Sequence, residues 1–211
     1  MLSYPVGCVL TANYILAKKR PGGHSRSDKE CIVMKINIFG ASGSGATTLG
    51  KALGQALGYP AFDGDEYFWM PSETPFTVRR NPEERNAMLN LDTARHKNWI
   101  LSGSVVSWNN NWDFDLSVFL YIPNTIRMDR LKKREFERYG DAIYTDPERA
   151  TLYHKFLDWA RGYDDNTTDG RTLNVHQDWM KTLTKPLLVI EGDTTVDERV
   201  GAVLRKLEEL K

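Results

Sequence analysis

The feature that most constrains the fold of this chain is a glycine-rich loop between a predicted strand and a predicted helix. Residues 35–40 (KINIFG) form a short β-branched and aromatic run that ends in glycine, which is typical of a buried strand. The loop GASGSGATT occupies residues 40–48, and residues 46–57 then carry leucines at every fourth position, which predicts a helix. In this setting the loop N–H groups and the helix N-terminus can bind phosphate oxygens.

Predicted strands and helices alternate along the rest of the chain. Further strands are predicted at residues 59–65, 99–104, 116–123 and 186–193, and helices at residues 82–97, 124–139, 146–161, 171–183 and from residue 196 onward. Strands that alternate with helices favour a parallel sheet covered by helices. We therefore expect an α/β fold with a five-stranded parallel sheet over residues 34–211.

Residues 1–33 differ from the rest of the chain. They show no helical or alternating period and end in a polar, basic run, after which Met34 opens the first strand. We expect a disordered or non-native N-terminal extension, with natural translation starting at Met34. Both cysteines, Cys8 and Cys31, lie here, which argues against a disulfide framework or a thiolate metal site in the body of the protein. The four histidines are scattered, which argues against a zinc site.

Charge and hydropathy argue against two classes of partner. The formal net charge is +0 at pH 7, so no global field attracts nucleic acid or an anionic membrane. No apolar run approaches the roughly 20 residues that span a bilayer. We expect a cytoplasmic protein whose partners are small molecules.

The glycine loop departs at one position from the phosphate-binding pattern G-x-x-x-x-G-K-[ST]. Alanine stands at position 46, where the pattern has a lysine that reaches the β- and γ-phosphates. The backbone cradle does not need that lysine, so we expect its loss to impair catalysis more than binding. Thr47 can place its hydroxyl on Mg²⁺. The predicted nucleotide-binding residues of the loop are Gly40, Ala41, Ser42, Gly43, Ser44, Gly45, Ala46, Thr47 and Thr48.

A charged helix offers replacement cations. Arg127, Arg130, Arg134 and Arg138 are spaced by three, four and four residues, so they share one helical face. A solvated charged helix is the alternative interpretation, but the arginine fork suits phosphate oxygens. We expect Arg127, Arg130 and Arg134 to contact the phosphates as catalytic groups.

Polar residues also follow the second and third predicted strands. Asp63 and Asp65 end the second strand, and both point the same way if the strand pattern persists. We expect Asp63 to hold Mg²⁺ and Asp65 to accept a proton from, or orient, a substrate hydroxyl; a plain turn is the alternative. The residues expected to bind the acceptor are Asp65, Arg79, Arg80, Ser102, Gly103 and Ser104.

These residues together resemble the nucleoside monophosphate kinase-like branch of the P-loop kinases, which includes adenylate, shikimate and gluconate kinases. The resemblance covers about residues 35–210 and rests on GASGSGATT, FDGD, LSGS, the arginine helix and IEGD before the last helix. The chain is still more similar to a bacterial group of uncharacterised adenylate kinase-like AAA proteins, whose loop often lacks the lysine.

The resemblance implies a P-loop NTPase fold, a three-layer sandwich with a helical lid inserted at about residues 139–183. It implies that ATP and Mg²⁺ bind at the glycine loop, with the adenine near Gly192 and Asp193, and that the arginine helix closes over the phosphates. The expected function is transfer of the γ-phosphoryl group to an unidentified small-molecule acceptor. A nucleotide-binding regulator without transfer activity is the alternative, and a protein that binds another phosphorylated ligand is the third.

Overall fold

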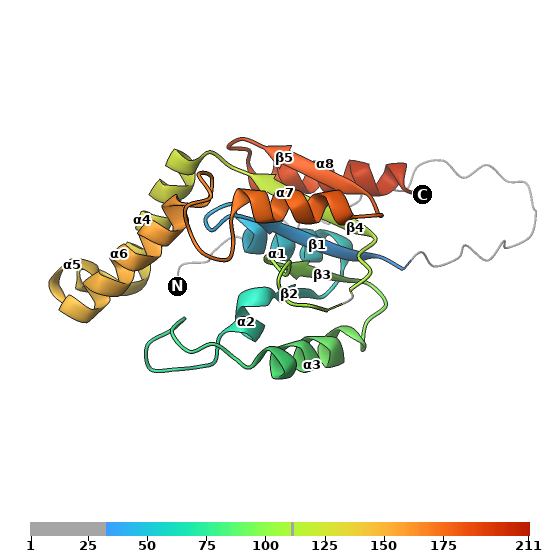
Figure 1. Ribbon diagram of the computed structural model, residues 1–211. Helices are drawn as coiled ribbons and strands as arrows, with labels where there is room; N and C mark the ends of the chain where they lie inside the picture. The colour runs from blue at the N-terminus through green and yellow to red at the C-terminus, as the bar shows by residue number, and fades with distance from the viewer. Residues whose placement is uncertain (1–32, 111) are drawn as a thin grey trace, which may run out of the picture. The chain divides into compact units, whose positions relative to one another are not determined.

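Five parallel strands form one sheet in the computed structural model, which describes residues 33–110 and 112–211. The strands lie in the order β2-β3-β1-β4-β5, as Figure 1 shows. Their bounds are β1 Lys35–Gly40, β2 Ala61–Asp63, β3 Trp99–Ser102, β4 Leu116–Tyr121 and β5 Leu187–Glu191. The predicted five-stranded parallel sheet is confirmed. The expectation for the N-terminal extension, with both cysteines, lies outside the described residues except at Val33.

The strand register brings the carboxyl ends of the strands to one edge. Ile38 of β1 lies opposite Ser102 of β3 and Val118 of β4, and Asp63 of β2 lies opposite the same Ser102. In open parallel sheets, ligands bind at the carboxyl edge where the chain connections reverse direction, which here is between β1 and β4. The loop after Gly40 and the segment after Asp63 therefore open on the same edge.

One face of the sheet is covered by two amphipathic helices. α1 (Ala46–Leu57) and α8 (Val196–Glu209) lie on this face. The leucines of α1 and Val203 of α8 share a buried cluster with Ile36 and Ile38 of the central strand. Burial of these apolar side chains is the main favourable contribution to folding on this face.

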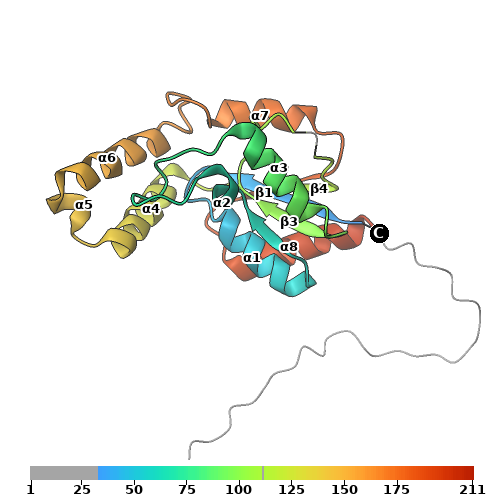
Figure 2. The ribbon, with the colours of Figure 1, turned by 90° about the horizontal axis from the view of Figure 1, so that it is seen from below.

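Two further helices cover the opposite face, which completes a three-layer sandwich (Figure 2). α3 (Pro82–Thr93) contributes Leu89 to a cluster with the apolar side chains of β3. α7 (Leu173–Thr182) packs Trp179 edge-to-face with Phe39 of β1, with ring centroids 4.8 Å apart. The three-layer sandwich expected from the family resemblance is confirmed.

A helical hairpin follows β4. α4 (Asn124–Tyr139), α5 (Ala142–Thr145) and α6 (Pro147–Arg161) share a core of their own, which includes Leu131 and Leu157. Figure 1 shows this hairpin extending away from the sheet. α7 packs on the sheet instead, so only the first part of the expected lid segment belongs to the hairpin.

Several elements differ from the sequence prediction in their bounds, and two short helices were missed. The second strand ends at Asp63 rather than at residue 65, because α2 (Gly64–Phe68) begins there with Asp63 as its N-cap. The helix that starts at Pro82 ends at Thr93 rather than at residue 97, since the chain must extend again before β3. α5 was not predicted as a helix. It has only four residues, which lie between Gly140 at the end of α4 and Pro147 at the start of α6.

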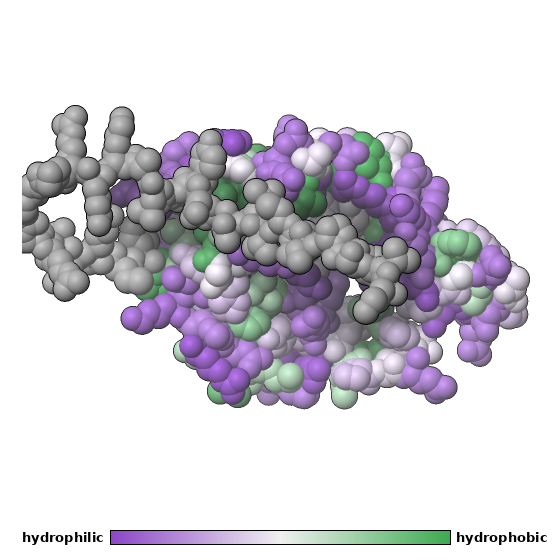
Figure 3. Space-filling model, turned by 180° about the vertical axis from the view of Figure 1, so that it is seen from behind, coloured by the Kyte–Doolittle hydropathy of each residue, from purple (hydrophilic) through white to green (hydrophobic). Residues whose placement is uncertain are grey.

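Hydrophilic side chains predominate on the face shown in Figure 3, as far as the described residues are visible there. Hydrophobic side chains form small separate groups between them. No helix in the described part of the chain is long and apolar enough to cross a bilayer.

Candidate active site

The glycine loop folds tightly at the carboxyl end of β1. Gly43 and Gly45 have φ angles of 82° and 90°, which L side chains rarely adopt. Gly40 lies so close to β4 that a Cβ would come within 2.5 Å of the Leu120 carbonyl oxygen. Gly45 is the N-cap of α1, and no described side chain caps that helix by a hydrogen bond. The first N–H groups of α1 are therefore open to an anion.

Arg127 is the most deeply buried of the predicted catalytic arginines. Its side chain is 1% exposed, its Nε donates to the Ile122 carbonyl oxygen at 3.0 Å, and its Nη1 donates to the Ser42 carbonyl oxygen at 3.3 Å. Its Nη2 pairs with the carboxylate of Asp164. All three donor groups thus bind the chain itself and position the loop, and the expected contact of Arg127 with phosphate stays a prediction.

Arg130 lies beside the loop and remains partly accessible. Its Nη1 donates to the Gly43 carbonyl oxygen at 3.2 Å, and its Nη2 pairs with Asp193. Gly192 turns the chain with a φ of 84° and donates its N–H to the Tyr121 carbonyl oxygen at 2.9 Å. The structure therefore brings together the glycine loop, Arg130 and the two residues expected near the adenine.

Asp65 lies among arginines from two parts of the chain, α4 and the segment before α7. Solvent reaches its side chain, yet the surrounding protein desolvates the carboxylate enough to raise its pKa. Arg171 is the strongest opposing charge and lowers that pKa; Asp63 raises it, and Arg134 and Arg138 lower it. The chain thus provides a carboxylate with positive charges around it, an arrangement suited to an anionic or polar substrate.

The strand pattern that would point Asp63 and Asp65 the same way does not persist to Asp65. Asp65 lies in the first turn of α2, and its N–H donates to Asp63 Oδ1 at 3.1 Å. The two-residue period of a strand, which would point both side chains the same way, ends at this N-cap. The two carboxylates nevertheless stay at the same sheet edge.

The oxygen donors at this edge fit Mg²⁺. The hydroxyl of half-buried Thr47 and the carboxylate of half-buried Asp63 come from the segments that follow β1 and β2. Mg²⁺ usually takes one or two carboxylates together with waters and substrate phosphates. Within residues 33–110 and 112–211 no three His, Cys, Asp or Glu side chains gather into a metal site. The donor set suits an ion held jointly with phosphates.

Ser102 faces the packed interior rather than the open edge. It is 2% exposed, and a Cβ on Gly50 of α1 would lie only 1.9 Å from its Oγ. Gly103 follows with a φ of 121°. The Ser102 side chain packs against α1, and its expected contact with the acceptor stays a prediction.

A buried histidine joins Ser104 to the segment after α6. His176 of α7 contacts Ser104 Oγ through Nε2 at 2.8 Å and Tyr163 Oη through Nδ1 at 2.6 Å. Burial, and next the charge of Arg171, lower the pKa of His176 to about 3, so the ring stays neutral at pH 7. Sequence reasoning missed this bridge, since Ser104 lies 72 residues from His176 and Tyr163 lies 13 residues from it, before α7 begins.

The two arginines expected at the acceptor differ in their surroundings. Arg80 donates from Nε to the Tyr67 carbonyl oxygen at 3.0 Å and forms an ion pair with Glu84. Arg79 is exposed, with its guanidinium 5.7 Å from the centre of the Phe68 ring. Of the two, Arg79 is the more accessible to a ligand.

Sequence reasoning also missed Arg171 and Arg199. Arg199 is 3% exposed and donates from Nη1 to the Ser44 carbonyl oxygen at 2.8 Å. The spacing in the last helix indicates that Arg199 is buried. It lies four residues before Val203 and eight before Leu207, so it shares their apolar face. Arg171 follows a turn-rich segment and has no comparable signal.

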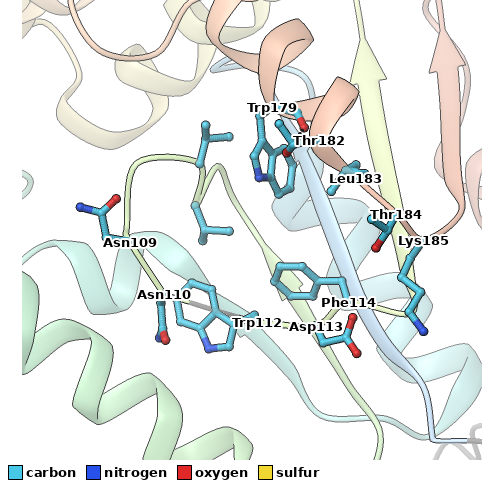
Figure 4. Close-up of a pocket in the computed structure, with 12 residues that line it drawn as sticks. Asn109, Asn110, Trp112, Asp113, Phe114, Trp179, Thr182, Leu183, Thr184 and Lys185 are labelled. Carbon is cyan, nitrogen blue, oxygen red and sulfur yellow. Dashed lines mark hydrogen bonds between the residues drawn. The ribbon is translucent and has the colours of Figure 1, made fainter.

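A separate cavity of about 360 Å³ lies beside α7. Figure 4 shows the rings of Trp179, Trp112 and Phe114 around it, with Asn109 and Lys185 farther out. Its lining includes no residue of the glycine loop and neither Asp63 nor Asp65. The candidate active site is therefore the loop edge of the sheet rather than this cavity.

Comparison with known proteins identifies a family and two relatives. The model of the AAA domain family matches residues 36–151. The chain is 42% identical over 171 residues to the uncharacterized protein YqaC of Bacillus subtilis, an alignment that covers 80% of this chain and 94% of that protein. It is 28% identical over 127 residues to a cytidylate kinase of Haloarcula marismortui, covering 55% of this chain and 66% of that protein.

A solved structure is also similar. The deoxyadenosine kinase from M. mycoides with bound dATP aligns with a TM-score of 0.49 and 16% identity, over 83% of this chain and 100% of that one.

Proposed function

The chain belongs to the AAA domain family, and we propose that it is a kinase that transfers the γ-phosphoryl group of ATP to a small-molecule acceptor. One observation carries the proposal. The uncapped N-terminus of α1 and the carboxylate of Asp65 open on the same edge of the sheet, each with arginines nearby. An anion site next to a carboxylate base is what phosphoryl transfer to a hydroxyl requires.

The phosphates of ATP bind at the glycine loop. The N–H groups of the loop and the partial positive charge of the α1 N-terminus hold the phosphate oxygens. Arg134 adds positive charge near Asp65, with its Nη2 3.4 Å from the Glu135 carboxylate, and would neutralise charge on the transferring group. Thr47 and Asp63 would hold Mg²⁺, which when bound neutralises negative charge on the phosphates.

Asp65 acts as the proton acceptor. The acceptor hydroxyl gives its proton to the Asp65 carboxylate as its oxygen forms a bond to the γ-phosphorus. The bond between that phosphorus and the oxygen bridging to the β-phosphate breaks, and ADP leaves with the electron pair. The raised pKa of Asp65 makes it a stronger base than an ordinary aspartate, while Arg171 and Arg134 favour its ionised form.

The acceptor is a nucleotide or another small polar metabolite. The similarity to a protein described as a cytidylate kinase supports a nucleotide. Exposed Arg79 and the half-buried Arg171 offer guanidinium groups for an anionic group of such a substrate.

Ala46 favours a second candidate, a nucleotide-binding regulator without transfer activity. The lysine of the usual loop acts on charge that develops during transfer, and the chain lacks it. Binding depends mainly on the backbone, so a regulator would keep the loop and lose the chemistry.

Titration calorimetry and a transfer assay distinguish the two candidates. The full chain is titrated with ATP and MgCl₂, and nucleoside monophosphates and polyols are then screened for acceptor-dependent release of ADP. We expect Asp65→Asn to bind ATP normally and to lose transfer by about 10²- to 10⁴-fold, the usual contribution of a general base. The control Glu66→Gln changes an exposed carboxylate of the same helix and leaves both readouts unchanged. Binding without acceptor-dependent ADP would support the regulator and overturn the kinase.

A further inference from the structure

A buried cation lies against the loop that lacks its lysine. Nη1 of Arg199 donates to the Ser44 carbonyl oxygen at 2.8 Å, and a Cβ on Gly45 would come within 2.9 Å of the same nitrogen. Gly45 is the N-cap of α1, so the guanidinium of Arg199 lies at the N-terminus of that helix. A glycine at position 45 leaves the space that this guanidinium occupies.

One nitrogen of the Arg199 guanidinium lacks a partner. Nε donates to Thr194 Oγ1 at 2.9 Å, and Nη1 is bound to Ser44. Nη2 is buried, and no atom of residues 33–110 or 112–211 accepts a hydrogen bond from it. Buried donors are nearly always paired, so this one is a candidate for a bond to a ligand.

The local charges favour an anionic ligand. The N-terminus of α1 carries a partial positive charge. Burial, and next the charge of Arg130, lower the pKa of Arg199, while Asp193 and Glu198 partly oppose this effect. Asp193 already pairs with Arg130. A phosphate oxygen would supply the missing acceptor for Nη2 and a negative charge beside the guanidinium.

We propose that Arg199 replaces the missing lysine at position 46, with its Nη2 donating a hydrogen bond to a phosphate oxygen of the bound nucleotide. The inference rests on the proposed function, because it identifies a residue that holds the phosphates of ATP. Arg199 approaches the loop from α8, whereas the lysine of the usual pattern comes from the loop itself. The arginine helix α4 is then not the sole source of positive charge beside the phosphates.

Binding of ATP and of inorganic tripolyphosphate tests the contact. Calorimetric titration of the full chain compares Arg199→Met with the control Arg205→Met, which changes an exposed arginine of the same helix. We expect Arg199→Met to weaken both ligands by about 10- to 100-fold, the effect of a lost hydrogen bond to a charged group. We expect Arg205→Met to bind like the unchanged protein. Equal binding by all three proteins would overturn the proposal.

Ala46→Lys separates a lost charge from a loosened loop. If Arg199 replaces the lysine, Ala46→Lys raises the ATP affinity of Arg199→Met by about 10-fold or more and that of the unchanged protein much less. Equal effects in both backgrounds would mean that Arg199 only supports the loop. Thermal denaturation without ligand reports whether Arg199→Met folds. If it does not, Arg199→Lys takes its place, with intermediate affinity expected because it keeps the charge and loses the fork.

The outcomes separate this inference from the kinase proposal. Binding of ATP that depends on Arg199, without transfer to any acceptor, overturns the kinase and supports the contact. Transfer with a KM for ATP that Arg199→Met leaves unchanged overturns the contact alone. Failure of the unchanged protein to bind ATP or tripolyphosphate overturns both.

Discussion

Arg127 of α4 donates a hydrogen bond to the carbonyl oxygen of Ser42 in the glycine loop at 3.3 Å. The same guanidinium pairs with Asp164, which lies after α6. The base of the helical hairpin, the loop and the segment that leads to α7 are therefore tied together by one buried side chain. If the hairpin moves over the sheet edge, this side chain would transmit the movement to the glycine loop.

Replacing Arg127 by methionine is expected to destabilise the protein strongly. The change leaves the Asp164 carboxylate and two carbonyl oxygens in the interior without their donor. Removal of one partner of a buried ion pair typically costs about 3–5 kcal/mol. Chemical denaturation measures the free energy of unfolding, and Lys132→Met on the exposed side of α4 serves as the control. A loss of less than about 1 kcal/mol would contradict the positioning role.

A methyl group at Gly50 is expected to disturb the packing of α1 on the sheet. A Cβ at this position would lie 1.9 Å from Ser102 Oγ and 3.2 Å from Ser102 Cβ. Overpacking of this kind costs about 1–3 kcal/mol, so Gly50→Ala should lower the free energy of unfolding by that amount. Ser102→Ala removes the oxygen and should recover part of the loss in the double variant.

The control for this prediction is Gly201→Ala in α8. The nearest atom to a Cβ there is Arg205 Nη1 at 3.4 Å, an ordinary contact. Alanine is the better helix former, so this change should stabilise the protein by about 0.5–1 kcal/mol. Additive effects of Gly50→Ala and Ser102→Ala would show that the two positions are not in contact.

The sheet and the glycine loop could be predicted from the sequence because their signals are local. The run that ends at Gly40, the leucine spacing of α1 and the arginine spacing of α4 each lie within one element. The meeting of the loop and Asp63 at one edge follows from the parallel arrangement, because parallel strands all end at the same edge of the sheet. The order of the strands was not predicted, since the same alternation of strands and helices is compatible with several orders.

The partners of the arginines could not be predicted, because they are distant in the chain. Arg127 and Asp164 are 37 residues apart, and Arg199 and Ser44 are 155 residues apart. The spacing of Arg127 and Arg134 indicates a shared helix face but not which of them is buried. Leu131 on that face was the available sign that its N-terminal end packs inward.

His176 is expected to make the protein sensitive to acid. Its pKa is lowered from 6.5 to about 3 in the folded protein, so the unfolded chain binds a proton first as the pH falls. The contribution to stability is fully present above about pH 6.5 and is lost toward pH 3, by about 1.4 kcal/mol per pH unit for one proton. Denaturation of His176→Gln over this range should show a pH slope that is smaller by this amount. The matched control is His154→Gln, which replaces an exposed histidine by the same residue.

Arg171 is expected to set the pH at which transfer begins. Asp65 must be ionised to accept a proton, so kcat/KM should fall on the acid side as Asp65 becomes protonated. Arg171 is the strongest charge that lowers the pKa of Asp65, and Arg171→Gln removes it. The pH at which kcat/KM falls on the acid side should therefore be higher in Arg171→Gln. Arg161→Gln changes an exposed arginine at the end of α6 and should leave that pH unchanged. If that pH stays fixed in Arg171→Gln while kcat/KM falls uniformly, this would mean that Arg171 binds substrate without acting on the base.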